Sequence, residues 1–121
     1  MGSSFTELVV DAADPDRLAQ FWSAVLGWRP TGRYEGAVEI AATAGVGPSL
    51  TFVPVPDDKR SKNRLHIDVS PTGCDQAQEV ERLIGLGARR ADVGQGERSW
   101  VVLADPEGNE FCVLRARLDE R

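Results

Sequence analysis

The chain has 121 residues with 14 basic and 19 acidic side chains, which give a net charge of −5 at pH 7. This balance argues against nucleic-acid binding, because phosphates require a basic face. No apolar run approaches the roughly 20 residues of a membrane span, and the 41% hydrophobic and 27% charged residues are typical of a globular protein. Two cysteines and no signal segment lead us to expect a cytoplasmic protein without a disulfide framework.

The first half predicts one strand, one helix and three further strands. A strand is expected over residues 5–11, where Leu8 and Val10 alternate with Glu7. A helix should run from Asp14-Pro15, which combine a capping side chain with a proline at the first helical position, to Gly27. The apolar period then changes from 3.6 to 2, which predicts strands over residues 28–34, 37–44 and 49–55.

The second half repeats this order. It predicts a strand over residues 64–70, a helix from Asp75 to Gly87, and strands over 88–93, 98–104 and 109–116. The turn residues of Asp105–Asn109 predict a hairpin between the last two strands. We therefore expect a single domain over residues 1–121, with repeats at about 5–55 and 64–117 and a polar linker over 56–63.

Several motifs resemble the vicinal oxygen chelate superfamily of glyoxalase I, bleomycin-resistance proteins and extradiol dioxygenases, and most of all a glyoxalase-like subgroup. They are Asp14-Pro15, Phe21-Trp22, Leu26-Gly27-Trp28, Leu65-His66-Ile67-Asp68, Leu86-Gly87-Ala88-Arg89 and Asp105-Pro106-Glu107-Gly108-Asn109. The resemblance implies an α+β fold in which two βαβββ repeats form a curved, half-open mixed β-barrel with the helices outside. It also implies a homodimer.

The resemblance further implies a divalent metal, held by residues of the first strand of each half and of the last strand. Carried over by motif, these ligands are Glu7, His66 and Cys112. Cys112 is a departure, because metal-dependent members usually have Glu there. A thiolate favours zinc over harder ions, and zinc, nickel and manganese are the candidate metals. The single histidine cannot supply the 2-His-1-carboxylate triad of Fe(II) dioxygenases, so that activity is set aside.

Each of these residues also has a structural explanation. His66 can be a hydrogen-bonded structural residue whose ring Asp68 orients. Glu7 can be a solvated charge at a strand end, and Cys112 a small buried hydrophobe. Trp100 can stack on a planar ligand, and Asp68 is the second candidate ligand-binding residue. Strand parity nevertheless predicts that Glu7, His66 and Cys112 face one cavity, walled partly by Trp100.

Two functions stay open at this point. The first is a metal-dependent lyase or isomerase of the glyoxalase type, in which the metal chelates two vicinal oxygens and Glu7 or Glu110 is the general base. The alternative is a metal-free dimer, without a cofactor, that binds a planar or cationic small molecule as resistance proteins do. Glu7 and His66 at ligand positions favour the enzyme, whereas Cys112 and the tryptophans favour the binding protein.

Overall fold

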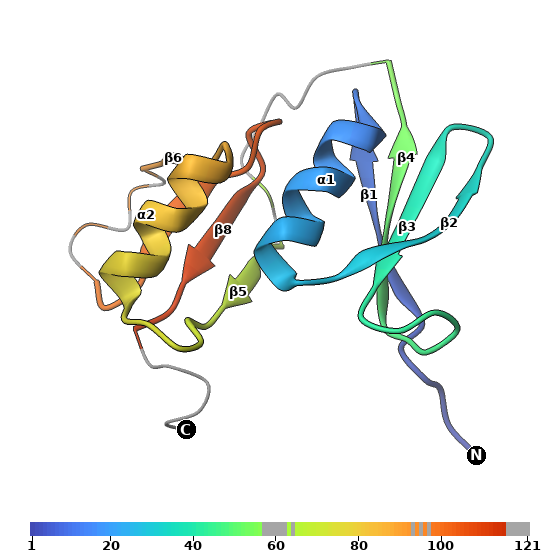
Figure 1. The fold of residues 1–121 in the computed structure, drawn as a ribbon, viewed down its shortest axis with the longest axis horizontal. Coiled ribbons are helices and arrows are strands. Elements are labelled where there is room, and N and C mark those ends of the chain that lie inside the picture. Colours follow the sequence, from blue (N-terminus) through green and yellow to red (C-terminus); the bar gives the residue numbers. More distant parts are fainter. Residues whose placement is uncertain (57–62, 64, 93, 95, 97, 116–121) are drawn as a thin grey trace. The chain divides into compact units, whose positions relative to one another are not determined.

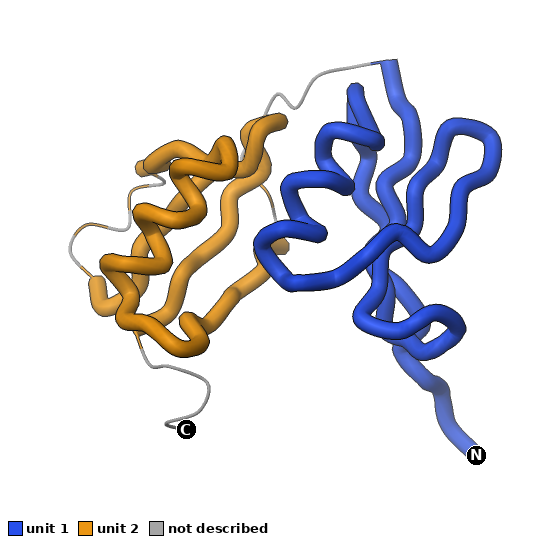
Figure 2. The backbone as a smooth tube through the Cα atoms, viewed as in Figure 1, with its two compact units in different colours: residues 1–58 blue, residues 59–121 orange. Residues whose placement is uncertain are grey.

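The protein is described by a computed structural model that covers residues 1–56, 63, 65–92, 94, 96 and 98–115. It divides into two compact units, Met1–Asp58 and Lys59–Arg121 (Figure 2). The predicted linker lies, apart from Pro56 and Asn63, outside the described residues. The single-domain organisation over residues 1–121 stays a prediction.

Each unit has one helix and one four-stranded mixed sheet (Figure 1). The first unit contains β1 (Glu7–Ala12), α1 (Pro15–Leu26), β2 (Arg29–Tyr34), β3 (Ala37–Ala41) and β4 (Ser49–Pro54). The second contains β5 (Ile67–Val69), α2 (Gln76–Leu86), β6 (Arg89–Arg90), β7 (Val101–Ala104) and β8 (Glu110–Val113). The predicted α+β class with two βαβββ repeats is confirmed.

The first sheet has the strand order β1-β4-β3-β2, with β1 parallel to β4 and the other pairs antiparallel. Because side chains alternate along a strand, one face of the sheet is apolar and the other largely polar. The apolar face and the stripe of α1 form the core of this unit from these buried residues: Leu18, Phe21, Trp22, Val25, Val38, Ile40, Leu50 and Phe52. The polar face is thereby turned away from the helix.

The second sheet repeats this arrangement with the order β5-β8-β7-β6, in which β5 is parallel to β8. Helix α2 lies against β8 (Figure 1). Its Val80 and Leu83 are buried, as are Leu103, Phe111 and Val113 of the sheet. Because side chains alternate along a strand, residues between the buried ones, such as Cys112, point to the opposite face of the sheet.

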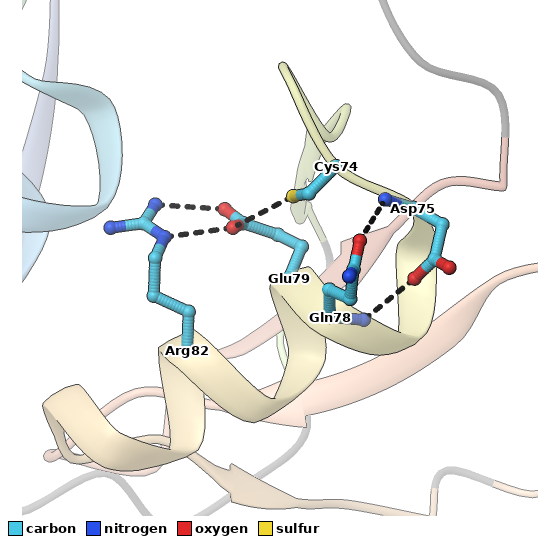
Figure 3. A network of polar contacts seen from close by, with 5 residues as sticks. All are labelled: Cys74, Asp75, Gln78, Glu79 and Arg82. Carbon is cyan, nitrogen blue, oxygen red and sulfur yellow. Dashed lines mark hydrogen bonds and ion pairs between the residues drawn. The ribbon is translucent and has the colours of Figure 1, made fainter.

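Both helices begin and end where the sequence predicts. Asp14 accepts a hydrogen bond from the backbone N–H of Arg17 at 3.2 Å, and Gly27 has the left-handed φ of 69° that ends α1. At α2, the Asp75 carboxylate accepts from the Gln78 backbone N–H at 2.8 Å, and Gln78 Oε1 accepts from the Asp75 N–H at 3.0 Å (Figure 3). This reciprocal capping box provides acceptors for two backbone N–H groups that have no partner within the helix.

We expect Asp75→Ala to lower the free energy of unfolding by about 1 kcal/mol, because the cap acceptor for Gln78 is lost. Asp75→Ser, which keeps an acceptor oxygen, should retain most of the stability. Urea unfolding followed by circular dichroism measures both. Glu81→Ala, an exposed position of α2, removes the same charge and should change stability by less than about 0.5 kcal/mol. Equal losses in Asp75→Ala and Glu81→Ala would contradict a capping role.

A buried carboxylate follows the cap in α2. Glu79 is only 7% exposed and accepts two hydrogen bonds at 2.8 Å from the Nε and Nη2 atoms of Arg82 (Figure 3). The Cys74 thiol donates to the same carboxylate at 3.9 Å. The hydrogen bond with Glu79 raises the pKa of Arg82 above its usual value. The buried charge is thus compensated locally, as burial of a carboxylate requires.

Several strands are shorter than predicted. The strand expected over residues 64–70 is reduced to β5, so His66 precedes a strand instead of lying in it. The strand expected over 98–104 begins at Val101, which leaves Trp100 in a bend. Strand β8 has only four residues, so β5 and β7 can form backbone hydrogen bonds with it over no more than four residues each. A strand persists only where a neighbour continues the hydrogen-bond ladder.

Candidate functional site

Three side chains with metal-binding atoms lie together on the second sheet, on the face away from the buried Phe111 and Val113. These are His66, Asp68 and Cys112, whose nitrogen, oxygen and sulfur atoms all lie within 4.8 Å of one another. Asp68 and Cys112 are register partners in the β5–β8 pair. His66 comes two residues before Asp68, and its Nε2 lies 3.1 Å from Asp68 Oδ1. We call these three residues the NOS cluster.

The members of the NOS cluster differ in burial. Cys112 is 7% exposed, beside its buried partner Val102 on β7. The side chains of His66 and Asp68 are 53% and 47% exposed. A buried thiol therefore adjoins an accessible imidazole and carboxylate, an arrangement open to a ligand from the exposed side.

The donor set of the NOS cluster suits zinc, which takes thiolate, imidazole and carboxylate ligands. Bond lengths of about 2.1 Å place neighbouring ligand atoms of a tetrahedral zinc roughly 3.4 Å apart, close to the 3.1 Å between His66 and Asp68. The ligand atoms of all three residues lie within 4.8 Å of one another. Sequence analysis gave Asp68 a ligand-binding or orienting role, and the structure adds it to the metal-capable set.

Glu7 belongs to the other unit. It lies on β1, where its Oε2 accepts a hydrogen bond from Thr51 Oγ1 at 3.3 Å. The predicted meeting of Glu7 with His66 and Cys112 joins the two units and stays a prediction.

The strand registers show how the two halves correspond. In the first half β1 and β4 align Val9 with Thr51, and in the second half β5 and β8 align Asp68 with Cys112. Glu7 lies two residues before Val9, and His66 lies two residues before Asp68. Glu7 and His66 therefore occupy equivalent positions in the two halves. Thr51 is then the equivalent of Cys112, at an offset of 61 residues. This register, which sequence analysis did not use, makes Thr51 the first-half counterpart of Cys112.

A second group of polar side chains lies on the first sheet. Glu39 of β3 is the register partner of Thr51, and its Oε1 accepts a hydrogen bond from Thr31 Oγ1 at 2.6 Å. Ser49 of β4 is the register partner of Glu7. These five residues (Glu7, Thr31, Glu39, Ser49 and Thr51) are named the polar row. Sequence analysis missed Glu39, although its alternation with Val38 and Ile40 signals a face away from the helix.

Two other predicted residues have structural contacts. Glu110 Oε2 accepts from the backbone N–H of Asn63 at 3.1 Å, which ties Asn63 to β8. Trp100 is 37% exposed, and the guanidinium of Arg98 lies 5.9 Å from its ring centroid, a cation–π geometry. The catalytic role of Glu110 and the stacking role of Trp100 stay predictions.

Residues 7–114 match the family model of the glyoxalase-like domain. The chain belongs to this glyoxalase-like family. A search of curated proteins found no match. The glyoxalase-like fold is also found in solved structures: a hypothetical protein of S. aureus (17% identity, TM-score 0.67) covers 96% of this chain and 95% of its own.

Two further structures carry functional descriptions. One is the trypanothione-dependent glyoxalase I of Leishmania major (14% identity, TM-score 0.63), with 94% of this chain and 87% of that chain covered. The other is the fosfomycin resistance protein FosX of Mesorhizobium loti (18% identity, TM-score 0.61), with 99% and 95% covered. At these identities the likeness establishes the fold. Among the described residues of this glyoxalase-like protein, no helix has the length and apolarity to span a membrane.

Proposed function

We propose that this glyoxalase-like protein binds a small molecule and acts on it as a metal-dependent lyase or isomerase. The observation that carries the proposal is the NOS cluster, which gathers three donor types within 4.8 Å. One similar fold belongs to a glyoxalase I, which supports a reaction of this class. The ligand is a small molecule, and we also propose a homodimer located in the cytoplasm.

The metal would be held by His66 and Cys112, with Asp68 as a further donor and Glu7 as the predicted donor from the first half. Zinc suits the thiolate best, with nickel and manganese as alternatives. When bound, the metal supplies Lewis-acid polarisation of two adjacent substrate oxygens. The substrate class is therefore a compound with vicinal oxygens.

The protein's own part in the reaction is proton transfer by a carboxylate. Glu7 is the favoured base, and it can act as one when Asp68, which offers a carboxylate oxygen within the NOS cluster, takes its place as the carboxylate donor to the metal. Thr51 donates to Glu7 Oε2 and thereby orients it. Glu110 is the second candidate, but the N–H of Asn63 already occupies one of its oxygens.

The test is deuterium exchange at the hydroxymethyl carbon of hydroxyacetone, a small probe with vicinal oxygens, followed by proton NMR in D₂O. Exchange should require both protein and zinc, and Glu7→Gln should slow it about 100-fold or more, the usual contribution of a general base. Glu81→Gln on α2, a change of the same kind at an exposed position, should leave the rate unchanged. Exchange no faster than with zinc alone would contradict the enzymatic proposal.

A metal-free binding protein for a planar or cationic small molecule is the second candidate. It is favoured by the His66–Asp68 pair, whose 3.1 Å contact satisfies both groups without a metal, and by the exposed ring of Trp100. In this case no cofactor is needed. The fosfomycin resistance protein shares the fold, which supports a role in handling antibiotic-like molecules.

A further inference from the structure

We propose that the metal centre is complete within the second half of the chain, with His66, Asp68 and Cys112 as its ligands and Glu7 outside it. The inference rests on the proposed metal-dependent function and names the ligand set of that site. It differs from the set carried over by motif, in which Glu7 is the carboxylate ligand and Asp68 orients the ring of His66 or binds the small molecule.

The NOS cluster gathers its donor atoms through the pairing of two strands of one sheet. Asp68 and Cys112 are register partners across β5 and β8, so their side chains leave the same face. His66 lies two residues before Asp68, and its Nε2 already lies 3.1 Å from Asp68 Oδ1. The ligand atoms of all three residues lie within 4.8 Å of one another. The second half thus brings three ligand types together without a residue of the first half.

The first half does not carry this donor set at its equivalent positions. These positions hold Glu7, Val9 and Thr51. Val9 has no donor atom, and the Thr51 hydroxyl donates its hydrogen to Glu7 Oε2 at 3.3 Å. Zinc ligands are thiolates, imidazoles and carboxylates. At matched positions, the first half therefore offers one such ligand and the second half offers three.

The charge of the NOS cluster matches that of a divalent cation. Cysteine ligates as a thiolate and aspartate as a carboxylate, whereas histidine ligates as the neutral imidazole. Cys112 and Asp68 together therefore neutralise Zn²⁺. Because Cys112 is only 7% exposed, an uncompensated charge beside it would be costly. A further carboxylate from Glu7 would leave the centre with an excess negative charge.

A centre with these three ligands has room for substrate. Zinc in proteins is usually tetrahedral, and catalytic sites have three protein ligands and one open position. The side chains of His66 and Asp68 are 53% and 47% exposed, so a substrate oxygen can approach the cluster from their side. The inferred ligand set is therefore that of a catalytic metal and not of a closed structural one.

Cysteine substitution tests which carboxylate binds the metal. Co²⁺ bound to a thiolate shows a sulfur-to-cobalt charge-transfer absorption, which grows with each coordinated sulfur. We would record it with reduced thiols in a Cys74→Ser background, where Cys112 gives the reference intensity. Asp68→Cys should about double the intensity, because a thiolate replaces the carboxylate ligand. Glu7→Cys should leave it unchanged. A residue that only orients His66 would add no sulfur to the metal, so an unchanged intensity in Asp68→Cys would overturn the inference.

Zinc calorimetry keeps the inference testable if a cysteine variant fails to fold. Asp68→Asn should weaken zinc binding about 100-fold, because the charged ligand is lost. Glu7→Gln, the matched change in the first half, should weaken it less than about twofold. A doubled intensity in Glu7→Cys, or a larger loss in Glu7→Gln than in Asp68→Asn, would overturn the ligand set and leave the metal-dependent function standing. Wild type without cobalt absorption or zinc heat would overturn both.

Discussion

Metal-free protein should bind one Zn²⁺ per chain, and Cys112→Ser should weaken that binding about 100-fold. Cys112 supplies the soft thiolate of the NOS cluster, which zinc prefers over hydroxyl oxygen. His66→Ala removes the nitrogen donor and should have an effect of similar size. Calorimetric titrations with Zn²⁺, Ni²⁺ and Mn²⁺ measure both changes, and manganese should be least affected by Cys112→Ser because it prefers oxygen ligands.

Cys74→Ser is the matched control, since the Cys74 thiol contacts Glu79 and is not part of the NOS cluster. It should leave zinc affinity unchanged. Equal and negligible heats in wild type and His66→Ala would remove the metal from the proposal. The metal-free binding function would then be the better explanation of the same surface.

Asp105→Ala should be the most destabilising substitution, with a loss of about 3–5 kcal/mol in the free energy of unfolding. Asp105 is 1% exposed, and its Oδ1 accepts from the backbone N–H groups of Glu107 and Asn109, both at 2.9 Å. The Asn109 side-chain amide donates to both carboxylate oxygens, at 3.1 and 3.0 Å. Truncation would leave these partly buried donors without an acceptor in the turn that joins β7 to β8.

Urea unfolding measures this loss. Asp92→Ala is the control, because Asp92 accepts a similar turn hydrogen bond from the Gly94 N–H at 2.7 Å but is exposed. It should cost less than about 1 kcal/mol, since water replaces the lost partner. A comparable loss in both variants would show that the burial of Asp105 is unimportant.

The helices and the repeat were predictable because their determinants are local. Asp14 and Asp75 cap the first turns, and Gly27 ends α1 with a positive φ. Such capping signals involve only four or five consecutive residues, so they can be recognised in the sequence alone. The hairpin turn at Asp105–Asn109 was predictable for the same reason, although its burial was not.

The strand ends could not be predicted because they depend on partners distant in the sequence. His66 directly precedes β5 and Trp100 directly precedes β7, but neither residue pairs with β8 in the sheet. Alternation still indicated that His66, Asp68 and Cys112 share a face. The polar row was missed because it needs the register of β3 against β4 and the bulge at Thr31, which only the assembled sheet defines.

The unequal strand lengths of the two sheets have a consequence for local unfolding. Strands β5 and β6 have three and two residues, whereas each strand of the first sheet has five or six. Shorter ladders open at lower free energy, so backbone amides of the second sheet should exchange with solvent before those of the first. A ligand that binds both His66, before β5, and Cys112 of β8 would hold these two segments together and so hinder local unfolding of the second sheet. Binding of a ligand to the NOS cluster could then be detected as slower hydrogen exchange of backbone amides in the second half of the chain.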